Sequence, residues 1–277
     1  MKLVFPITEG DMKRGKKYAG STECVPFIAF LSTTSFQENK LNPNNTEQQT
    51  LQAISRAVKF NRWMYETIKP YCNGRVLEVG SGIGNISSFF VQDNFDITLS
   101  DIDDHYIQKL NNRFAPAGNV RDIIFLDLQQ PDFQNSYATI MGSFDTVFLL
   151  NVLEHLDNDS QALHNCKKLL KTGGTLVVLV PAYSWLYSKL DKGLRHCRRY
   201  TLGMLQNLFN KQQLTVRKRF YFNALGIVAW SYAKIFRLSA VPGGEMGIYN
   251  KLVPLAKAID RLFVAKIGLS AIIIGEK

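Results

Sequence analysis

The sequence is poor in cysteine and has no long apolar run. Its four cysteines, Cys24, Cys72, Cys166 and Cys197, lie far apart and form no C-x-x-C pair. This spacing argues against a disulfide framework or a zinc cluster and is typical of a reducing compartment. No stretch reaches the roughly 20 uninterrupted apolar residues of a membrane-spanning helix, and the apolar run at residues 25–31 is too short for a signal peptide. We therefore expect a cytoplasmic protein.

Acidic residues are too few to balance the basic ones. The 33 lysines and arginines exceed the 23 aspartates and glutamates, which gives a formal net charge of +10. Such a surplus favours an anionic partner: a nucleic acid, an anionic membrane surface, or a phosphorylated or carboxylated substrate. Because the basic residues are spread over several segments and no RNA-binding module is recognisable, we rank nucleic acid below a small-molecule or lipid-linked acceptor.

What the chain does have is a glycine-rich stretch at residues 76–85, Val-Leu-Glu-Val-Gly-Ser-Gly-Ile-Gly-Asn. Its apolar start predicts a buried strand, and Gly80, Gly82 and Gly84 predict a sharp turn into a helix with the backbone close to a ligand. The third glycine of a dinucleotide fingerprint is replaced by asparagine, so a pyrophosphate site is not expected. Glu78, which we place at the exposed end of the strand, could instead help to hold a cationic amino-acid ligand.

This Glu/Asp-x-Gly-x-Gly pattern resembles that of the class I S-adenosylmethionine (SAM)-dependent methyltransferases. The resemblance covers roughly residues 50–222 and 269–277, and it implies SAM as the cofactor and S-adenosylhomocysteine as the product. It also implies a doubly wound α/β fold with a seven-stranded, mostly parallel sheet whose last strand is antiparallel. The alternation of strands and helices along the chain separately predicts a mostly parallel sheet.

Further cofactor-binding residues are expected where neighbouring strands end. Asp101 follows a strand at residues 96–100, where a carboxylate can accept both hydroxyls of a ribose, and Asp103 is the alternative acceptor or a helix cap. The resemblance implies that Asp127 accepts a hydrogen bond from the adenine amino group and that Leu128 flanks the ring. The predicted cofactor-binding residues are Glu78, Gly80, Ser81, Gly82, Gly84, Asp101, Ile102, Asp127, Leu128 and Asn151.

Two of the four histidines, His155 and His196, lie in segments expected at the cleft and are candidate catalytic bases. The strand at residues 144–152 leads into Asn151-Val-Leu-Glu-His155, and strand ends line the ligand crevice of an open α/β sheet. Small-RNA 2′-O-methyltransferases use a Glu-x-x-Glu-His metal motif, whose first carboxylate is here Asn151, so we expect no metal. A structural hydrogen-bonding role is the alternative for His155. Asp159 is expected to cap the helix that follows.

A basic segment, Arg195-His-Cys-Arg-Arg-Tyr-Thr, follows the fifth predicted strand. Guanidinium groups pair with carboxylate or phosphate in bidentate fashion, so we predict an anion clamp with Arg195, Arg198, Arg199 and Tyr200 as substrate-binding residues. The segment resembles a His-x-Arg-Arg-Tyr signature of uncharacterised bacterial methyltransferases. A solvated basic loop is the alternative.

The predicted organisation is a polar lead-in at residues 1–46 and one methyltransferase domain at residues 47–277. The domain is expected to begin with a capping box at Thr46 and an amphipathic helix over residues 51–68. Residues 223–268 form an insertion of two helices broken near Pro242, with apolar faces and a surplus of cations. We expect a lid that rests on an anionic membrane or covers an amphiphilic substrate; a dimer interface or an ordinary core would explain the same faces.

These observations predict an enzyme that methylates a small, or lipid- or glycan-linked, anionic acceptor. The alternatives are an RNA methyltransferase and a SAM-binding regulatory protein without turnover. The expected location is the cytoplasm. If the predicted lid rests on a membrane, the protein is expected at the inner face of that membrane.

Overall fold

The computed structural model describes residues 52, 54–236, 243–263 and 266–277. All of them belong to one compact unit, residues 37–277. The predicted lead-in at residues 1–46, with the capping box at Thr46, lies outside the described residues, as does Pro242.

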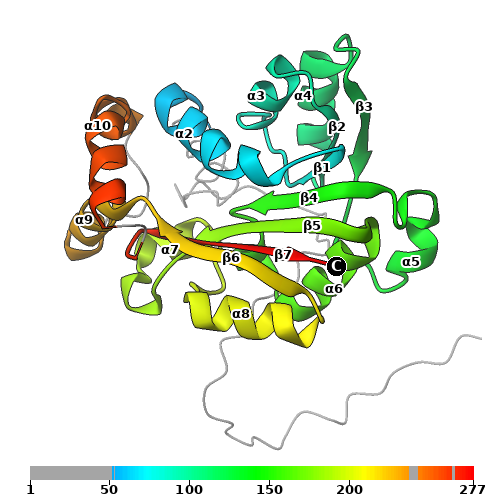
Figure 1. The fold of residues 1–277 in the computed structure, drawn as a ribbon. Coiled ribbons are helices and arrows are strands. Elements are labelled where there is room, and N and C mark those ends of the chain that lie inside the picture. Colours follow the sequence, from blue (N-terminus) through cyan, green and yellow to red (C-terminus); the bar gives the residue numbers. More distant parts are fainter. Residues whose placement is uncertain (1–51, 53, 237–242, 264–265) are drawn as a thin grey trace, which may run out of the picture. The chain divides into compact units, whose positions relative to one another are not determined.

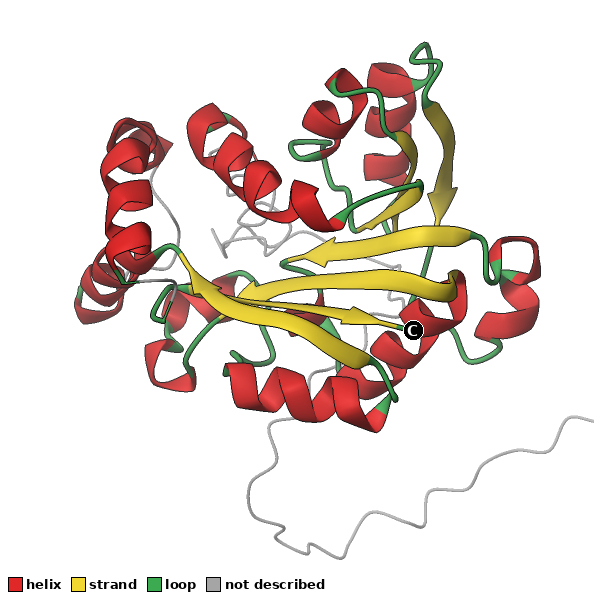
Figure 2. Ribbon diagram, in the orientation of Figure 1, coloured by secondary structure: helices red, strands yellow, loops and turns green. Residues whose placement is uncertain are grey.

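Seven strands form one sheet in the order β3-β2-β1-β4-β5-β7-β6 (Figures 1 and 2). Neighbouring strands from β3 to β5 are parallel, whereas β7 runs antiparallel to both β5 and β6. This confirms the predicted sheet, including its antiparallel last strand. The strands are β1 Arg75–Val79, β2 Asp96–Asp101, β3 Val120–Phe125, β4 Phe144–Leu150, β5 Leu170–Pro181, β6 Thr215–Phe222 and β7 Ser270–Glu276.

Helices connect the strands and cover both faces of the sheet (Figure 2). The α-helices are α2 Val58–Ile68, α3 Ser87–Gln92, α4 Asp104–Phe114, α5 Phe133–Ser136, α6 Asp159–Leu169, α7 Lys189–Gly193, α8 Leu202–Lys211, α9 Ala224–Ile235 and α10 Gly243–Leu262. The 3₁₀ turns are η1 Lys69–Tyr71, η2 Ala138–Ile140, η3 Leu153–His155 and η4 Ser184–Leu186. None of the described helices combines the length and apolar character needed to cross a bilayer.

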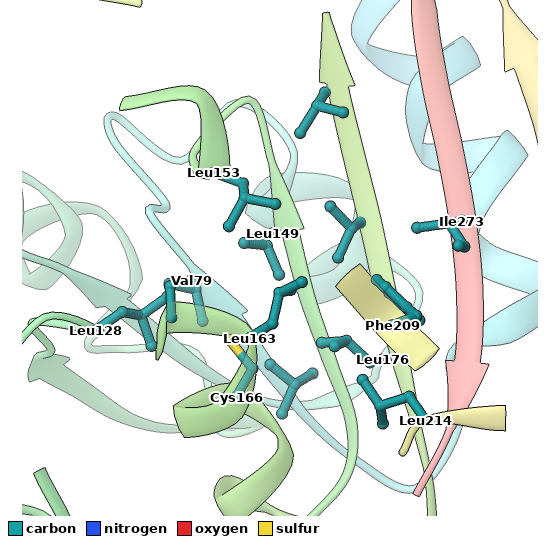
Figure 3. Close-up of a cluster of buried hydrophobic side chains, with 14 of the residues drawn as sticks. Val79, Leu128, Leu149, Leu153, Leu163, Cys166, Leu176, Phe209, Leu214 and Ile273 are labelled. Carbon is teal, nitrogen blue, oxygen red and sulfur yellow. The ribbon is translucent and has the colours of Figure 1, made fainter. Parts of the chain in front are cut away.

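Two hydrophobic clusters form the core, one on each face of the sheet. Along β5, Leu176 and Val178 face the cluster that includes α6 and α8 (Figure 3), and Val177 and Leu179 face the cluster that includes α2, α3 and α4. Because helices cover both faces, the central strands are apolar at nearly every position rather than at alternate ones. This arrangement leaves the carboxyl ends of the parallel strands as the place for polar side chains.

Two helix boundaries differ from the prediction. The helix expected over residues 51–68 is interrupted by a turn at Arg56, and α2 begins at Val58. The carbonyl of Ile54 accepts the backbone N–H of Ala57 at 2.9 Å, which closes a tight turn, and also the side-chain amide of Asn61 at 2.9 Å. The cap of α6 is Asn158, which accepts from the backbone N–H of Gln161, so the prediction that Asp159 is the cap was wrong.

The insertion between β6 and β7 contains the two predicted helices, which pack against each other (Figure 1). Asp260 of α10 accepts hydrogen bonds from the backbone N–H groups of Asn223 at 2.6 Å and Ala224 at 2.7 Å. It therefore satisfies free donors at the start of α9 and ties the two helices together. In the sheet, Phe222 before the insertion pairs with Ser270 after it.

Candidate active site

The glycine turn between β1 and α3 has the conformation that the sequence predicts. Gly80, Gly82 and Gly84 all have positive φ, at 71°, 55° and 78°. A Cβ atom on Gly80 would lie 2.5 Å from Cγ2 of Val152, and one on Gly84 would overlap the ring of Phe114. Both the backbone conformation and the packing therefore exclude side chains here, which leaves a bare backbone cradle of the kind that fits SAM.

Asp101, the last residue of β2, holds this turn. Its carboxylate accepts hydrogen bonds from the backbone N–H of Gly82 at 2.8 Å and of Asp103 at 3.0 Å. The carboxylate also accepts the backbone N–H of Ile102, so of its roughly four lone-pair sites about one remains for a ribose hydroxyl. Asp103 accepts from the backbone N–H of His105 at 2.8 Å and is the N-cap of α4.

The prediction that Glu78 lies at an exposed strand end was wrong. Glu78 is 4% exposed because β1 is a central strand and the start of α3 covers its end. Its carboxylate accepts a hydrogen bond from the hydroxyl of Ser87 in α3, and burial raises its pKa to about 8. Glu78 therefore joins β1 to α3 beneath the glycine turn.

Ser81 and Asn151 lie on either side of the β1 end. Ser81 donates its backbone N–H to the carbonyl of Ser100 at 2.8 Å, which ties the glycine turn to β2. Asn151 follows β4, is exposed and has a positive φ of 54°. Its side chain is thus presented at the carboxyl end of the sheet, as predicted from its position.

The residues predicted to contact the adenine ring differ in exposure. Asp127 is half-buried after β3 and accepts from the backbone N–H of Gln129 at 2.8 Å. Leu128 is 3% exposed and faces the core with Val79 and Leu163 (Figure 3), so it has almost no surface to offer a ring. Two apolar side chains are exposed at this edge: Ile102, next to Asp101, is 56% exposed, and Phe125, which pairs with Asp101 at the end of β3, is 47% exposed.

The basic segment does not form the predicted anion clamp, because its arginines have acceptors within the protein. Arg199 is 2% exposed; it donates to Asp191 at 2.7 Å and to the carbonyl of Ala182 at 3.0 Å. Its guanidinium carbon also lies 4.4 Å from the ring centroid of Trp230. Arg199 is therefore part of the interior and does not face a substrate.

Arg198 and Tyr200 are also held internally. Arg198 donates to Asp159 at 3.0 Å, and the buried Tyr200 donates its hydroxyl to the same carboxylate at 3.0 Å. Of the four predicted substrate residues, Arg195 is the exposed one, with a positive φ of 58°.

Asp191 is a residue of this region that the sequence prediction missed. Both of its oxygens are used: Oδ1 faces Arg199 and His196, and Oδ2 accepts the backbone N–H of Ser188 at 2.9 Å. Ser188 and Asp191 form a capping box at the start of α7. The Ser-x-x-Asp spacing was the sequence signal that could have revealed it.

The two candidate catalytic histidines do come together. The rings of His155 and His196 lie 4.9 Å apart between centroids and almost at right angles. Nδ1 of His196 is 3.0 Å from Oδ1 of Asp191. Burial, and next the proximity of His196, lower the pKa of His155 to about 3, so His155 is a weak proton acceptor.

Comparison with known proteins agrees with this geometry. Residues 77–176 match a family model described as a methyltransferase domain. The chain is 31% identical over 113 residues to lovastatin diketide synthase lovF of Aspergillus terreus, a match that covers 38% of this chain and 4% of lovF. It is 28% identical over 141 residues to polyketide methyltransferase ustM of Ustilaginoidea virens, covering 44% of this chain and 31% of ustM.

A solved structure gives the same fold over a longer stretch. Phosphoethanolamine N-methyltransferase 2 of Haemonchus contortus, in complex with SAM, superposes with a TM-score of 0.55 at 14% identity, covering 87% of this chain and 61% of that one. The matched segment is thus similar to a methyltransferase domain, and the fold is the one seen in a solved SAM-dependent methyltransferase, in agreement with the class that the sequence predicts. Within this chain, the methyltransferase domain match spans β1 to the middle of β5.

Proposed function

We propose that this protein transfers a methyl group from SAM to a small-molecule acceptor at the carboxyl ends of β1, β2 and β4. The observation that carries the proposal is the bare glycine turn held by the Asp101 carboxylate, with an acceptor site left for a ribose hydroxyl. A small-molecule acceptor is further supported by ustM, whose name describes a polyketide methyltransferase. The net charge of +10 favours an acceptor that carries an anionic group.

When bound, SAM supplies an electrophilic methyl group on a sulfonium whose leaving group is neutral. The protein's first task is therefore to position the cofactor and the acceptor. The turn backbone and Asp101 bind the nucleoside portion, and Ile102 offers an apolar surface beside it. Asn151 and His155, which follow β4, border the acceptor side. Any proton that the acceptor loses is taken up by water, because Asn151 is not a base and His155 is a weak proton acceptor.

Transfer of labelled methyl from SAM into fractions of the source cell tests this function. We expect label in the soluble small molecules or in the lipid extract, and none with Asp101→Ala, because that variant loses the turn's acceptor. Label in RNA would replace our acceptor class with the RNA methyltransferase alternative. Tight SAM binding with label in no fraction would identify a regulatory protein without turnover.

We further propose that α9 and α10 rest on an anionic membrane surface, which would favour a lipid-linked acceptor. Their exposed apolar side chains are Val228, Tyr232, Ile235 and Phe236 from α9, and Leu252, Leu255, Leu262 and Phe263 from α10 and its end. Val228, Tyr232 and Ile235 recur at helical spacing and form one stripe. Cations accompany them at Lys234, Lys251 and Arg261. An apolar stripe with cations beside it is the pattern of a helix that binds at a lipid interface.

Vesicle co-sedimentation tests this attachment. We expect binding to vesicles that contain anionic lipid and little binding to neutral ones. The double variant Val228→Ser/Ile235→Ser is expected to weaken binding at least ~10-fold, since burying a large aliphatic side chain contributes about 1.5–3 kcal/mol. Phe125→Ser, an exposed apolar residue on β3, is the matched control and is expected to bind as the unmodified chain does.

Two outcomes would overturn the membrane proposal. Equal binding to anionic and neutral vesicles would remove the role of the cations. A dimer in solution that the double variant dissociates, without vesicle binding by the unmodified chain, would assign the same face to a second copy of the protein.

A further inference from the structure

Three potential metal ligands meet at the carboxyl end of β4. Glu154 and His155 belong to η3, and His196 comes from the segment after α7. One ligand atom from each of the three lies within 4.8 Å of the others, and Nε2 of His196 is 3.9 Å from Oε1 of Glu154. Ligands bonded to one ion at about 2.0–2.2 Å lie up to roughly 4 Å apart, so small side-chain rotations would close the site.

The Glu154 carboxylate is the most unusual group in this cluster. It is 0% exposed, and among the described residues neither of its oxygens accepts a hydrogen bond. A buried carboxylate without a partner is costly unless it is protonated or bound to a cation. A group of this kind requires a partner, and the two histidines mark where that partner lies.

The neighbouring charged side chains do not supply a partner for the Glu154 carboxylate. The buried carboxylates are Glu154 and Asp191, and Arg199 is the guanidinium beside them. Arg199 directs its hydrogen bonds to Asp191 and Ala182, while its Nη2 has no partner in the described part of the chain. Arg199 is thus matched by Asp191, and no guanidinium donates to the Glu154 carboxylate. A cation between Glu154 and the histidines would give that carboxylate a partner.

Both histidines are oriented as metal ligands usually are. Ligating histidines commonly give their other ring N–H to a carboxylate or a backbone carbonyl, which fixes the ring and the free nitrogen. Nδ1 of His196 faces Asp191 at 3.0 Å, so its Nε2 is the nitrogen turned toward Glu154. The His155 ring interacts with the backbone of Arg195, which leaves its other nitrogen available.

We propose that Glu154, His155 and His196 bind one divalent transition-metal ion. Two imidazoles and one carboxylate suit zinc, cobalt, manganese or iron better than magnesium, which prefers oxygen ligands. We expected no metal because Asn151 replaces the first carboxylate of the Glu-x-x-Glu-His motif. The third ligand comes instead from His196, which the fold brings back from a distant part of the sequence.

The site adjoins the cofactor crevice. Val152, which packs against Gly80 of the glycine turn, lies two residues before Glu154. His155 is half-buried and offers access from solvent. Three protein ligands leave open positions on the ion for water or for an oxygen of the acceptor. Metal binding itself does not depend on methyl transfer, so the two proposals are tested separately.

Titration of the chelator-treated full-length protein with Zn²⁺ and with Co²⁺ tests the site, by calorimetry and by visible cobalt absorption. We expect one ion per chain, and at least ~100-fold weaker binding in Glu154→Gln and in His196→Asn. Asp191→Asn, which removes a group that orients a ligand, is expected to lower affinity by about 10–100-fold. His105→Asn and His164→Asn are matched controls outside the cluster and are expected to keep full affinity.

Circular dichroism and SAM binding confirm that each variant is folded. If Glu154→Gln fails to fold, His155→Asn decides the question, because that side chain is half-buried and its loss leaves the Glu154 carboxylate in place. Absence of one-to-one binding by the unmodified chain would overturn the proposal. Binding that is unchanged in His155→Asn and His196→Asn, or a response to Mg²⁺ alone, would do the same.

Discussion

Arg199→Met is expected to lower the free energy of unfolding by about 3–5 kcal/mol, because it leaves the Asp191 carboxylate buried without its partner. The guanidinium and the carboxylate are both fully buried at 2.7 Å. The substitution also removes the contact with the ring of Trp230. Urea unfolding followed by circular dichroism measures the change.

Arg198→Met is the matched control for this prediction. Arg198 also pairs with an aspartate, Asp159, but its side chain is 32% exposed. This pair is partly exposed, and Asp159 keeps its hydrogen bond from Tyr200, so the control should lose about 1 kcal/mol, clearly less than Arg199→Met. Equal losses in the two variants would contradict the prediction. If Arg199→Met kept normal stability but lost acceptor binding, the anion-clamp hypothesis would be supported again.

Gly80→Ala is expected to reduce SAM-dependent turnover by about 10²-fold. The new Cβ would lie 2.5 Å from Cγ2 of Val152, whereas carbon atoms pack at about 3.5–4.0 Å. The turn must therefore move by roughly 1 Å, and a displacement of that size at a binding site can cost 10²-fold in rate. SAM affinity by calorimetry and the rate of methyl transfer are the measurements.

Gly142→Ala separates this effect from backbone strain. Gly142 also has a positive φ, at 61°, but a Cβ there would meet no atom within 4 Å. We expect it to lose about 1 kcal/mol of stability, as for other residues forced into the left-handed region, and to keep its SAM affinity. Unchanged SAM affinity and turnover in Gly80→Ala would show that the turn does not approach the cofactor.

Local sequence patterns predicted the strands, a mostly parallel sheet and the glycine turn, whereas the seven-stranded sheet with an antiparallel last strand was implied by the family resemblance. Each locally predicted feature depends on residues close together in the chain, such as the three glycines or the apolar runs of β4 and β5. The position of Asp101 also followed, because a strand end in a parallel sheet has a defined place. The same reasoning failed for Glu78, since it could not show that Ser87 and the start of α3 cover the end of β1.

The basic segment shows where sequence reasoning stops. The partners of Arg198 and Arg199 are Asp159 and Asp191, and nothing in their spacing shows which arginine each one meets. The same limit applies to the Glu154, His155 and His196 cluster, which forms because Tyr200 pairs with Ala182 after β5 and returns the segment to the end of β4. Long-range pairing of this kind cannot be read from a motif of consecutive residues.

The pairing of Phe222 with Ser270 has an evolutionary consequence. The chain leaves the sheet and returns to it at adjacent positions, as it would around an ordinary hairpin loop. A change in the length or composition of the segment between β6 and β7 therefore leaves the strand register intact. Exchange of this segment would still have to keep the core contacts that α10 makes through Val253 and Ala256.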